Sequence, residues 1–192
     1  EYSAGIATTY LWRGTDLGQG APAFSAAADY AHESGAYAGL WASSGDDGTG
    51  TEYDLYAGYA LEAGDVSVDL SVATYAYSKS DDTGPGELSE AILGLGFQDA
   101  SLTYIDNLGD DDYSYIALGY STIVDVTVGM SDNGIGQEYT HIDLGYALTD
   151  ELSLTVSKVL DQSNSVAFLA DPDNGPVDED AIVVLSYSIA LK

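Results

Sequence analysis

The chain has 192 residues, enough for one sizeable domain over residues 1–192, and its formal net charge is −28, with 4 Lys and Arg against 32 Asp and Glu. This charge excludes binding to a nucleic-acid backbone, and the lack of cysteine excludes disulfides and thiolate metal sites. A hydrophobic content of 45% and 16 tyrosines indicate a folded chain rather than a disordered acidic one.

Apolar and polar residues alternate along most of the chain, which is the period of a β-strand. No apolar run reaches the length of a transmembrane helix, and no signal peptide is visible, so the numbering is expected to be that of a mature, processed chain. Twelve strands are predicted, over residues 2–13, 22–31, 36–43, 52–61, 66–77, 87–97, 100–105, 113–120, 123–131, 138–147, 152–160 and 181–191.

The connections between these strands alternate between short and long. The long connections hold most of the glycine and much of the aspartate. Tight periplasmic turns opposite longer external loops are typical of outer-membrane barrels, whereas a soluble sandwich has no reason to segregate its loops. The predicted fold is therefore all-β: a single antiparallel up-and-down transmembrane β-barrel of about 12 strands, with short periplasmic turns and longer acidic external loops.

A repeated step, in which a strand ends in an aromatic residue just before a short turn, predicts a ring of aromatics on the barrel exterior. Amphipathic rings are well placed at a lipid–water interface. Trp12, Phe24, Tyr53 and Tyr104 are candidates for a second ring at the opposite end. The predicted periplasmic ring consists of Tyr30, Tyr59, Phe97, Tyr120 and Tyr146.

The opposite face of the predicted strands carries Gly, Ser, Ala and Thr with scattered acids, and small residues leave room for water. Carboxylates that line a pore favour cations. An acidic surface that keeps a protein hydrated in high salt, as in a marine or halophilic organism, is the alternative explanation. The predicted pore-lining residues are Arg13, Asp29, Glu52, Asp54, Asp69, Glu90, Asp125, His141 and Asp143.

Two of these residues have a specific expected role. Arg13 lies near the loop end of the first predicted strand, where we expect an ordinary salt bridge to a lumen carboxylate. His141 lies beside Tyr139 and Asp143, as a base or metal ligand would, but no nucleophile can be assigned to it. We therefore predict no enzymatic activity and no required cofactor.

Aspartate clusters in the long connections suit a weak calcium site, because hard cations prefer oxygen ligands. Residues 171–175 depart from an EF-hand loop, with the glycine one position early and no matching bidentate glutamate. Solvated loops are the default interpretation. The candidate calcium ligands are Asp110, Asp111, Asp112, Asp171 and Asp173.

Three segments, at residues 9–14 (TYLWRG), 29–43 (DYAHESGAYAGLWAS) and 52–59 (EYDLYAGY), resemble the TorF family of proteobacterial outer-membrane porins. The resemblance is sharp over about the first sixty residues and looser through Glu90 and Gly94. It implies a β-barrel and passive transport, and it assigns no catalytic residue and no substrate. One departure is the carboxyl end, Tyr187 to Lys192, which lacks the terminal aromatic of many outer-membrane barrels.

The sequence thus predicts a porin in the outer membrane of a Gram-negative bacterium, with cation-biased diffusion of small solutes. The expected partners are outer-membrane lipid and small cations or small polar solutes, and homo-oligomers are compatible with this function. The alternative is a structural or adhesive surface barrel whose plugged lumen only displays acidic, calcium-binding loops. A third hypothesis is a soluble, acidic, secreted β-protein from a salty habitat.

Overall fold

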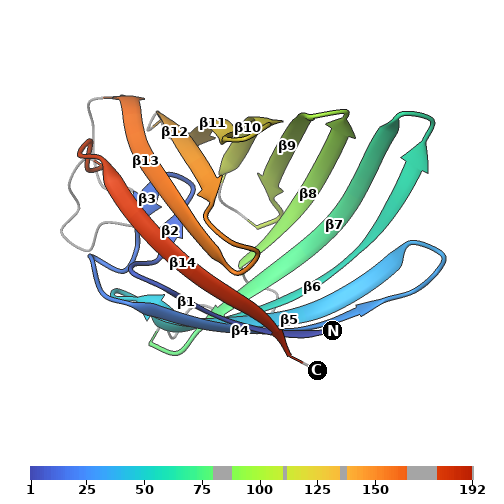
Figure 1. The fold of residues 1–192 in the computed structure, drawn as a ribbon, viewed down its shortest axis with the longest axis horizontal. Coiled ribbons are helices and arrows are strands. Elements are labelled where there is room, and N and C mark those ends of the chain that lie inside the picture. Colours follow the sequence, from blue (N-terminus) through green and yellow to red (C-terminus); the bar gives the residue numbers. More distant parts are fainter. Residues whose placement is uncertain (80–87, 110–111, 135–137, 164–176, 192) are drawn as a thin grey trace.

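The computed structural model describes residues 1–79, 88–109, 112–134, 138–163 and 177–191. Within these ranges, it contains no helix with the length and apolar character needed to cross a membrane. The regular structure of the described ranges consists of β-strands (Figure 1).

Twelve antiparallel strands form a closed barrel, which confirms the predicted fold class. Each barrel strand pairs with the next barrel strand along the chain, β1 with β4 across the intervening β2 and β3, and the pairing of the first and last strands, with Tyr2 opposite Leu191, closes the ring. The barrel strands are β1 (Tyr2–Ala7), β4 (Ala23–Ala31), β5 (Ala36–Asp46), β6 (Gly50–Ala63), β7 (Val66–Tyr77), β8 (Leu88–Phe97), β9 (Ala100–Asn107), β10 (Ser114–Ser121), β11 (Asp125–Asp132), β12 (Glu138–Ala147), β13 (Leu152–Gln162) and β14 (Ile182–Leu191).

The exterior of the barrel is apolar. Leu70, Leu118 and Val183, on three separated strands, have 56%, 59% and 59% of their surface exposed. Because side chains alternate along a strand, the neighbours of these residues face the interior, where Gly, Ser, Tyr and acids prevail. Most large aliphatic side chains of the strands therefore lie on the outside, and a few, such as Ile105 and Val159, are buried in the interior.

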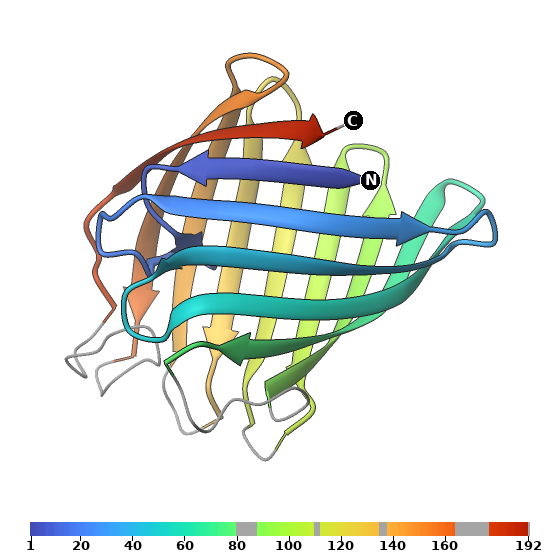
Figure 2. The same cartoon turned by 90° about the horizontal axis from the view of Figure 1, so that it is seen from below.

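Both termini and the short turns lie at one end of the barrel (Figure 2). The residues of the predicted periplasmic ring, Tyr30, Tyr59, Phe97, Tyr120 and Tyr146, lie on the exterior near these turns, all at least 44% exposed. Their role at a membrane interface stays a prediction. Of the second predicted ring, Phe24, Tyr53 and Tyr104 are exposed, but the placement of Trp12 there is wrong.

Trp12 is misplaced because the predicted strand over residues 2–13 ends early. β1 stops at Ala7, and the chain then folds into the barrel, where β2 (Leu11–Trp12) and β3 (Thr15–Asp16) pair as a small separate sheet (Figure 1). We call residues 8–22 the inward hairpin. Its turn, Arg13-Gly14, has φ angles of 45° and 86°, so the chain reverses in a tight turn at the point where the prediction ended the barrel strand and began a long loop.

The predicted long loop over residues 44–51 is also wrong. β5 continues to Asp46 and β6 begins at Gly50, with a register shift between Ser43 and Asp46. The Gly- and Asp-rich composition of this segment indicated a loop, but a neighbouring strand supplies ladder hydrogen bonds whatever the side chains are. The bulge between Ser43 and Asp46 accommodates the extra residue on β5, so both strands continue beyond their predicted ends.

Candidate functional site in the barrel lumen

The turn of the inward hairpin is held against β12. Trp12 pairs with Thr15, and the two residues between them have the positive φ angles of a type I′ turn. A Cβ atom on Gly14 would lie 2.4 Å from the His141 ring, so this position requires glycine for space as well as for backbone conformation. The Tyr139 hydroxyl donates to the Arg13 carbonyl at 2.8 Å, which fixes the turn on this wall.

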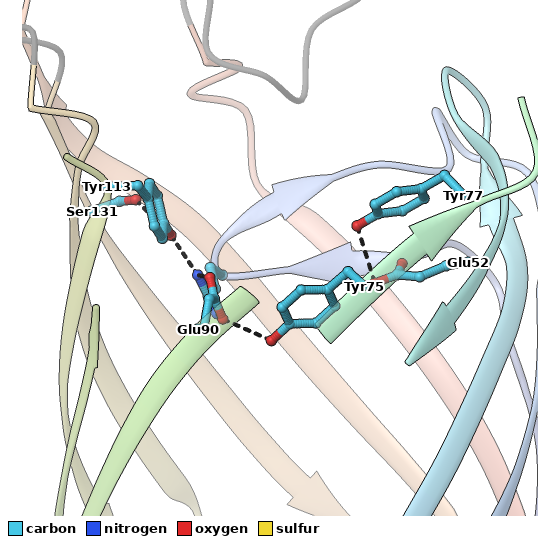
Figure 3. Close-up of polar contacts among 7 residues, drawn as sticks. Glu52, Tyr75, Tyr77, Glu90, Tyr113 and Ser131 are labelled. Carbon is cyan, nitrogen blue, oxygen red and sulfur yellow. Dashed lines mark hydrogen bonds and ion pairs between the residues drawn. The ribbon is translucent and has the colours of Figure 1, made fainter. Parts of the chain in front are cut away.

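Arg13 forms the central ion pair of the lumen. Its two terminal nitrogens donate to the two carboxylate oxygens of Glu90 on β8, at 2.9 and 2.6 Å. Glu90 also accepts from the Tyr75 hydroxyl at 2.7 Å, and Tyr113 accepts from Arg13 at 2.7 Å and from Ser131 at 3.1 Å (Figure 3). The bidentate contact between Arg13 and Glu90 is the strong, geometrically specific form of a carboxylate–guanidinium pair.

Aromatic rings surround the guanidinium. Its central carbon lies 4.5 Å from the Trp12 ring centroid, 5.3 Å from that of Tyr113 and 5.1 Å from that of Tyr115. Burial is the largest single effect and opposes the positive charge, but the hydrogen bonds to Glu90 and Tyr113 and the electrostatic attraction of these two groups together outweigh it and raise the pKa of Arg13 above its ordinary value. Arg13 is therefore charged, and its charge is matched by Glu90 rather than presented to solvent.

A second acidic group lies beside the other arm of the hairpin. Glu52 on β6 is only 2% exposed and accepts from the Tyr10 hydroxyl at 2.7 Å. It also accepts from the Tyr77 hydroxyl at 3.2 Å (Figure 3). Burial raises the pKa of Tyr10, and the charge of Glu52 raises it further, so Tyr10 acts as a hydrogen-bond donor. Asp54 shares the interior face of β6 two residues further along.

His141 is fully buried in a third polar cluster. Its Nδ1 lies 3.1 Å from Asp143 Oδ1, its Nε2 lies 3.0 Å from the Tyr115 hydroxyl, and Ser157 donates to Asp143 at 2.5 Å. The carboxylate thus lies between the serine and the imidazole, so His141 cannot take a proton from Ser157. This chain of hydrogen bonds links β10, β12 and β13 and does not activate a nucleophile.

The barrel wall near the short turns carries a recess. An open recess of about 260 Å³ is lined by small and polar interior residues such as Ser67, Gly94, Gly96 and Ser101. Two tyrosine rings lie flat against the wall beside it, since a Cβ on Gly39 or Gly58 would collide with Tyr56 or Tyr37. The hydroxyls of these tyrosines donate to Asp29 and Asp69 respectively, at 2.9 Å for Tyr37.

The predicted pore-lining residues fall into two groups rather than one continuous lining. Glu52, Asp54, Glu90, His141 and Asp143 lie around the inward hairpin, with Arg13 at its turn. Arg13 forms the expected ion pair, but from the hairpin rather than from a barrel strand. Asp29, Asp69 and Asp125 lie on the interior face near the short turns.

Most of the predicted calcium ligands, Asp110, Asp111, Asp171 and Asp173, lie outside the described residues. Asp112 is described and exposed. Across the described ranges, no three His, Asp or Glu side chains come together as metal ligands. Calcium binding therefore stays a prediction.

The interior tyrosines are not among the predicted pore-lining residues. Tyr75 and Tyr77 lie an even number of positions from Asp69, and Tyr113 and Tyr115 lie an even number of positions from Gly119. The strand alternation therefore places these tyrosines on the interior face. Arg13-Gly14 between Leu11-Trp12 and Thr15-Asp16 was also a readable signal for a two-residue hairpin turn. The sequence places Tyr139 beside His141 but assigns it no role. The missed residues are Tyr10, Tyr75, Tyr77, Tyr113 and Tyr115.

Comparison with known proteins gives one family and one fold. A family model described as "Bacterial protein of unknown function (Gcw_chp)" matches residues 1–174. Among solved structures, a KdgM porin is similar over 100% of this chain and 99% of its own, with a TM-score of 0.55 and 7% sequence identity. At this identity the likeness concerns the fold. No curated protein matches the sequence significantly.

Proposed function

The chain belongs to the Gcw_chp family, and we propose that it is a porin of the Gram-negative outer membrane through which small polar solutes, cations in particular, diffuse passively. The resemblance to the TorF family agrees with this proposal and stays a prediction. The similar fold of a protein named a KdgM porin adds support, since that fold suits a channel.

The observation that carries the proposal is the polarity of the closed barrel. In a water-soluble barrel the apolar face lies inside, whereas here large apolar side chains such as Leu70 and Leu118 are exposed on the exterior. In lipid, every backbone polar group needs a partner within the protein, and a closed ring of strands provides one. The exterior is therefore suited to lipid and the interior to water, which disfavours the soluble, secreted alternative.

The charge of the interior supports a bias toward cations. Near the short turns, Asp29, Asp69 and Asp125 lie on the interior face, and no Lys or Arg of the described chain accompanies them there. At the other end, the single guanidinium is matched by Glu90. A net negative lumen attracts cations and repels anions.

The test is conductance of the purified, refolded full chain in a planar bilayer under a salt gradient. We expect a current whose reversal potential shows preference for the cation. Replacing Asp69 and Asp125 with Asn should reduce this preference. The matched control replaces Asp99 and Asp150, which lie in short turns, and should change it less. A current without cation preference would refute the bias, and no current would refute the porin.

A second candidate is favoured by the inward hairpin itself. A structural or adhesive surface barrel needs no open lumen, and the hairpin lies inside one end of the barrel (Figure 1), where Thr9 and Thr15 are buried. A folded barrel that inserts into bilayers but passes no current would support this candidate. Calcium binding by its acidic loops would appear in calcium titrations of the same preparation by isothermal calorimetry.

A further inference from the structure

The inward hairpin is an insertion that barrel closure does not require. Ala7 on β1 lies directly opposite Ala23 on β4, so a two-residue turn would suffice to join these neighbouring strands. The chain instead places residues 8–22 between them and directs them into the lumen (Figure 1). The hairpin is thus a separate piece of structure whose position is set by its contacts with the walls.

Those contacts reach opposite walls. The Tyr10 hydroxyl donates to Glu52 on β6, while the Arg13 carbonyl accepts from Tyr139 and Gly14 lies against His141 on β12. In the closed ring of twelve strands, β6 and β12 are six positions apart, which is the greatest separation the ring allows. The hairpin therefore extends across the lumen rather than along one side of it.

The Arg13–Glu90 contact fixes the hairpin between these walls. β8 lies between β6 and β12 in the ring, and Glu90 on it binds both terminal nitrogens of Arg13. Arg13 has a positive φ, which residues other than glycine rarely adopt, so the surrounding contacts must hold its backbone in this conformation. Since its side chain is only 11% exposed, Arg13 contributes position rather than a free charge to the lumen.

We infer that the inward hairpin is the constriction of this pore and that Arg13 and Glu90 are the positioning residues that hold it across the lumen. The inference rests on the proposed porin function. It limits the permeant class to small ions and small polar solutes, because the gap beside the hairpin, not the width of a twelve-stranded barrel, sets the size limit. Displacing the hairpin widens the passage without altering the barrel wall.

Three variants of the full chain test this inference. The first replaces residues 8–22 with Asn-Gly, a two-residue turn that joins Ala7 to Ala23. The second combines Arg13→Gln with Glu90→Gln, which breaks the contact without changing the net charge. The matched control combines Lys158→Gln with Glu179→Gln. It also removes one positive and one negative charge, but from exposed side chains that do not contact the hairpin.

The measurements are single-channel conductance and the largest neutral polymer that blocks it, with folding checked by circular dichroism. We expect the hairpin deletion to raise conductance most, the Arg13/Glu90 variant to raise it about twofold, and the control to match the wild type. The fluorescence of Trp12, isolated by Trp41→Phe, reports hairpin displacement in the Arg13/Glu90 variant. If that variant fails to fold, the deletion still decides the question.

The outcomes separate this inference from the proposed function. A deletion variant that conducts when the wild type does not would support the constriction while refuting an open wild-type porin. A wild type and deletion variant with equal conductance and equal polymer exclusion would overturn the inference and leave the porin standing. Folded barrels that never conduct would overturn both.

Discussion

The two ends of the lumen are formed by the same strands but are filled differently. Around the inward hairpin, Ser131, His141 and Ser157 have no exposed surface, and tyrosine hydroxyls pair with each buried carboxylate of Glu52 and Glu90. Near the short turns, the same alternation places Gly, Ser and Asp around an open recess. We refer to these as the hairpin end and the turn end.

The difference shows that strand alternation specifies which way a residue faces but not whether it is packed. A barrel interior becomes a core only where side chains are large and a further segment enters it. The hairpin end should therefore respond to substitution like a protein core, and the turn end like a surface. Matched substitutions at the two ends measure this contrast directly.

Removing an interior carboxylate should give the largest contrast. Glu90→Gln at the hairpin end leaves the buried Arg13 charge without its partner and should lower the free energy of unfolding by about 3 kcal/mol. Asp69→Asn at the turn end removes a carboxylate that likewise accepts from a tyrosine, and should cost less than about 1 kcal/mol. Urea titration in lipid vesicles, followed by circular dichroism, measures both. Equal losses would mean that the two ends are equally packed.

The hairpin turn should show the next largest effect. Gly14→Ala places a Cβ 2.4 Å from the His141 ring at a φ of 86°, and we expect a loss of about 2–3 kcal/mol. Gly20→Ala in the same hairpin has a φ of 77° but meets nothing within 4 Å, and should cost only about 1 kcal/mol. The same titration applies. A Gly14→Ala variant no less stable than Gly20→Ala would contradict the close contact with β12.

Interior glycines of the barrel strands should repeat the contrast without any effect of positive φ. A Cβ on Gly129 would lie 2.3 Å from both His141 and the Tyr115 hydroxyl, so Gly129→Ala should cost about 2 kcal/mol. At the turn end, the nearest atom to a Cβ on Gly94 is 3.4 Å away, and Gly94→Ala should stay within about 0.5 kcal/mol of the wild type. Thermal unfolding of the two variants side by side is sufficient. A destabilised Gly94→Ala would show that the recess is narrower than described.

Single hydroxyl deletions should give the smallest effects. Tyr115→Phe removes the hydrogen bond to the fully buried His141 and should cost about 1–2 kcal/mol. Tyr37→Phe removes a hydrogen bond to Asp69 that water can replace, and should cost less than about 0.5 kcal/mol. Urea midpoints of the two variants at equal slope test the order. A reversed order would place the better-solvated pair at the hairpin end.

The barrel itself could be predicted because its signal is local. The apolar residues Val66, Val68, Leu70 and Val72 alternate with Ser67, Asp69 and Ser71. This period of two can be recognised without knowing which strand pairs with the segment. The number of strands and the side on which the short turns lie followed from the same pattern. The strand limits near residues 44–51 did not, because cross-strand hydrogen bonds extended a segment whose side chains favour a loop.

The candidate site was predicted only as a set of facing residues. Alternation directed Glu52, Glu90 and His141 inward, but no local pattern states that a distant segment covers them. The alternation of the preceding residues predicts that Arg13 ends a strand and that a loop begins at Gly14, whereas the structure has a tight turn at Arg13-Gly14. Its ion-pair partner lies 77 positions away in the chain, a contact that depends on closure of the ring.

By itself, the sequence determined the period of the strands, the apolar exterior and the acidic interior, because these depend on side-chain type and a fixed backbone repeat. Only the tertiary structure decided that residues 8–22 enter the barrel and that Arg13 meets Glu90, Tyr113 and the surrounding rings. These contacts join strands that are remote in the chain and become neighbours only when the ring closes. The division of the lumen into a packed end and an open end is a consequence of that closure.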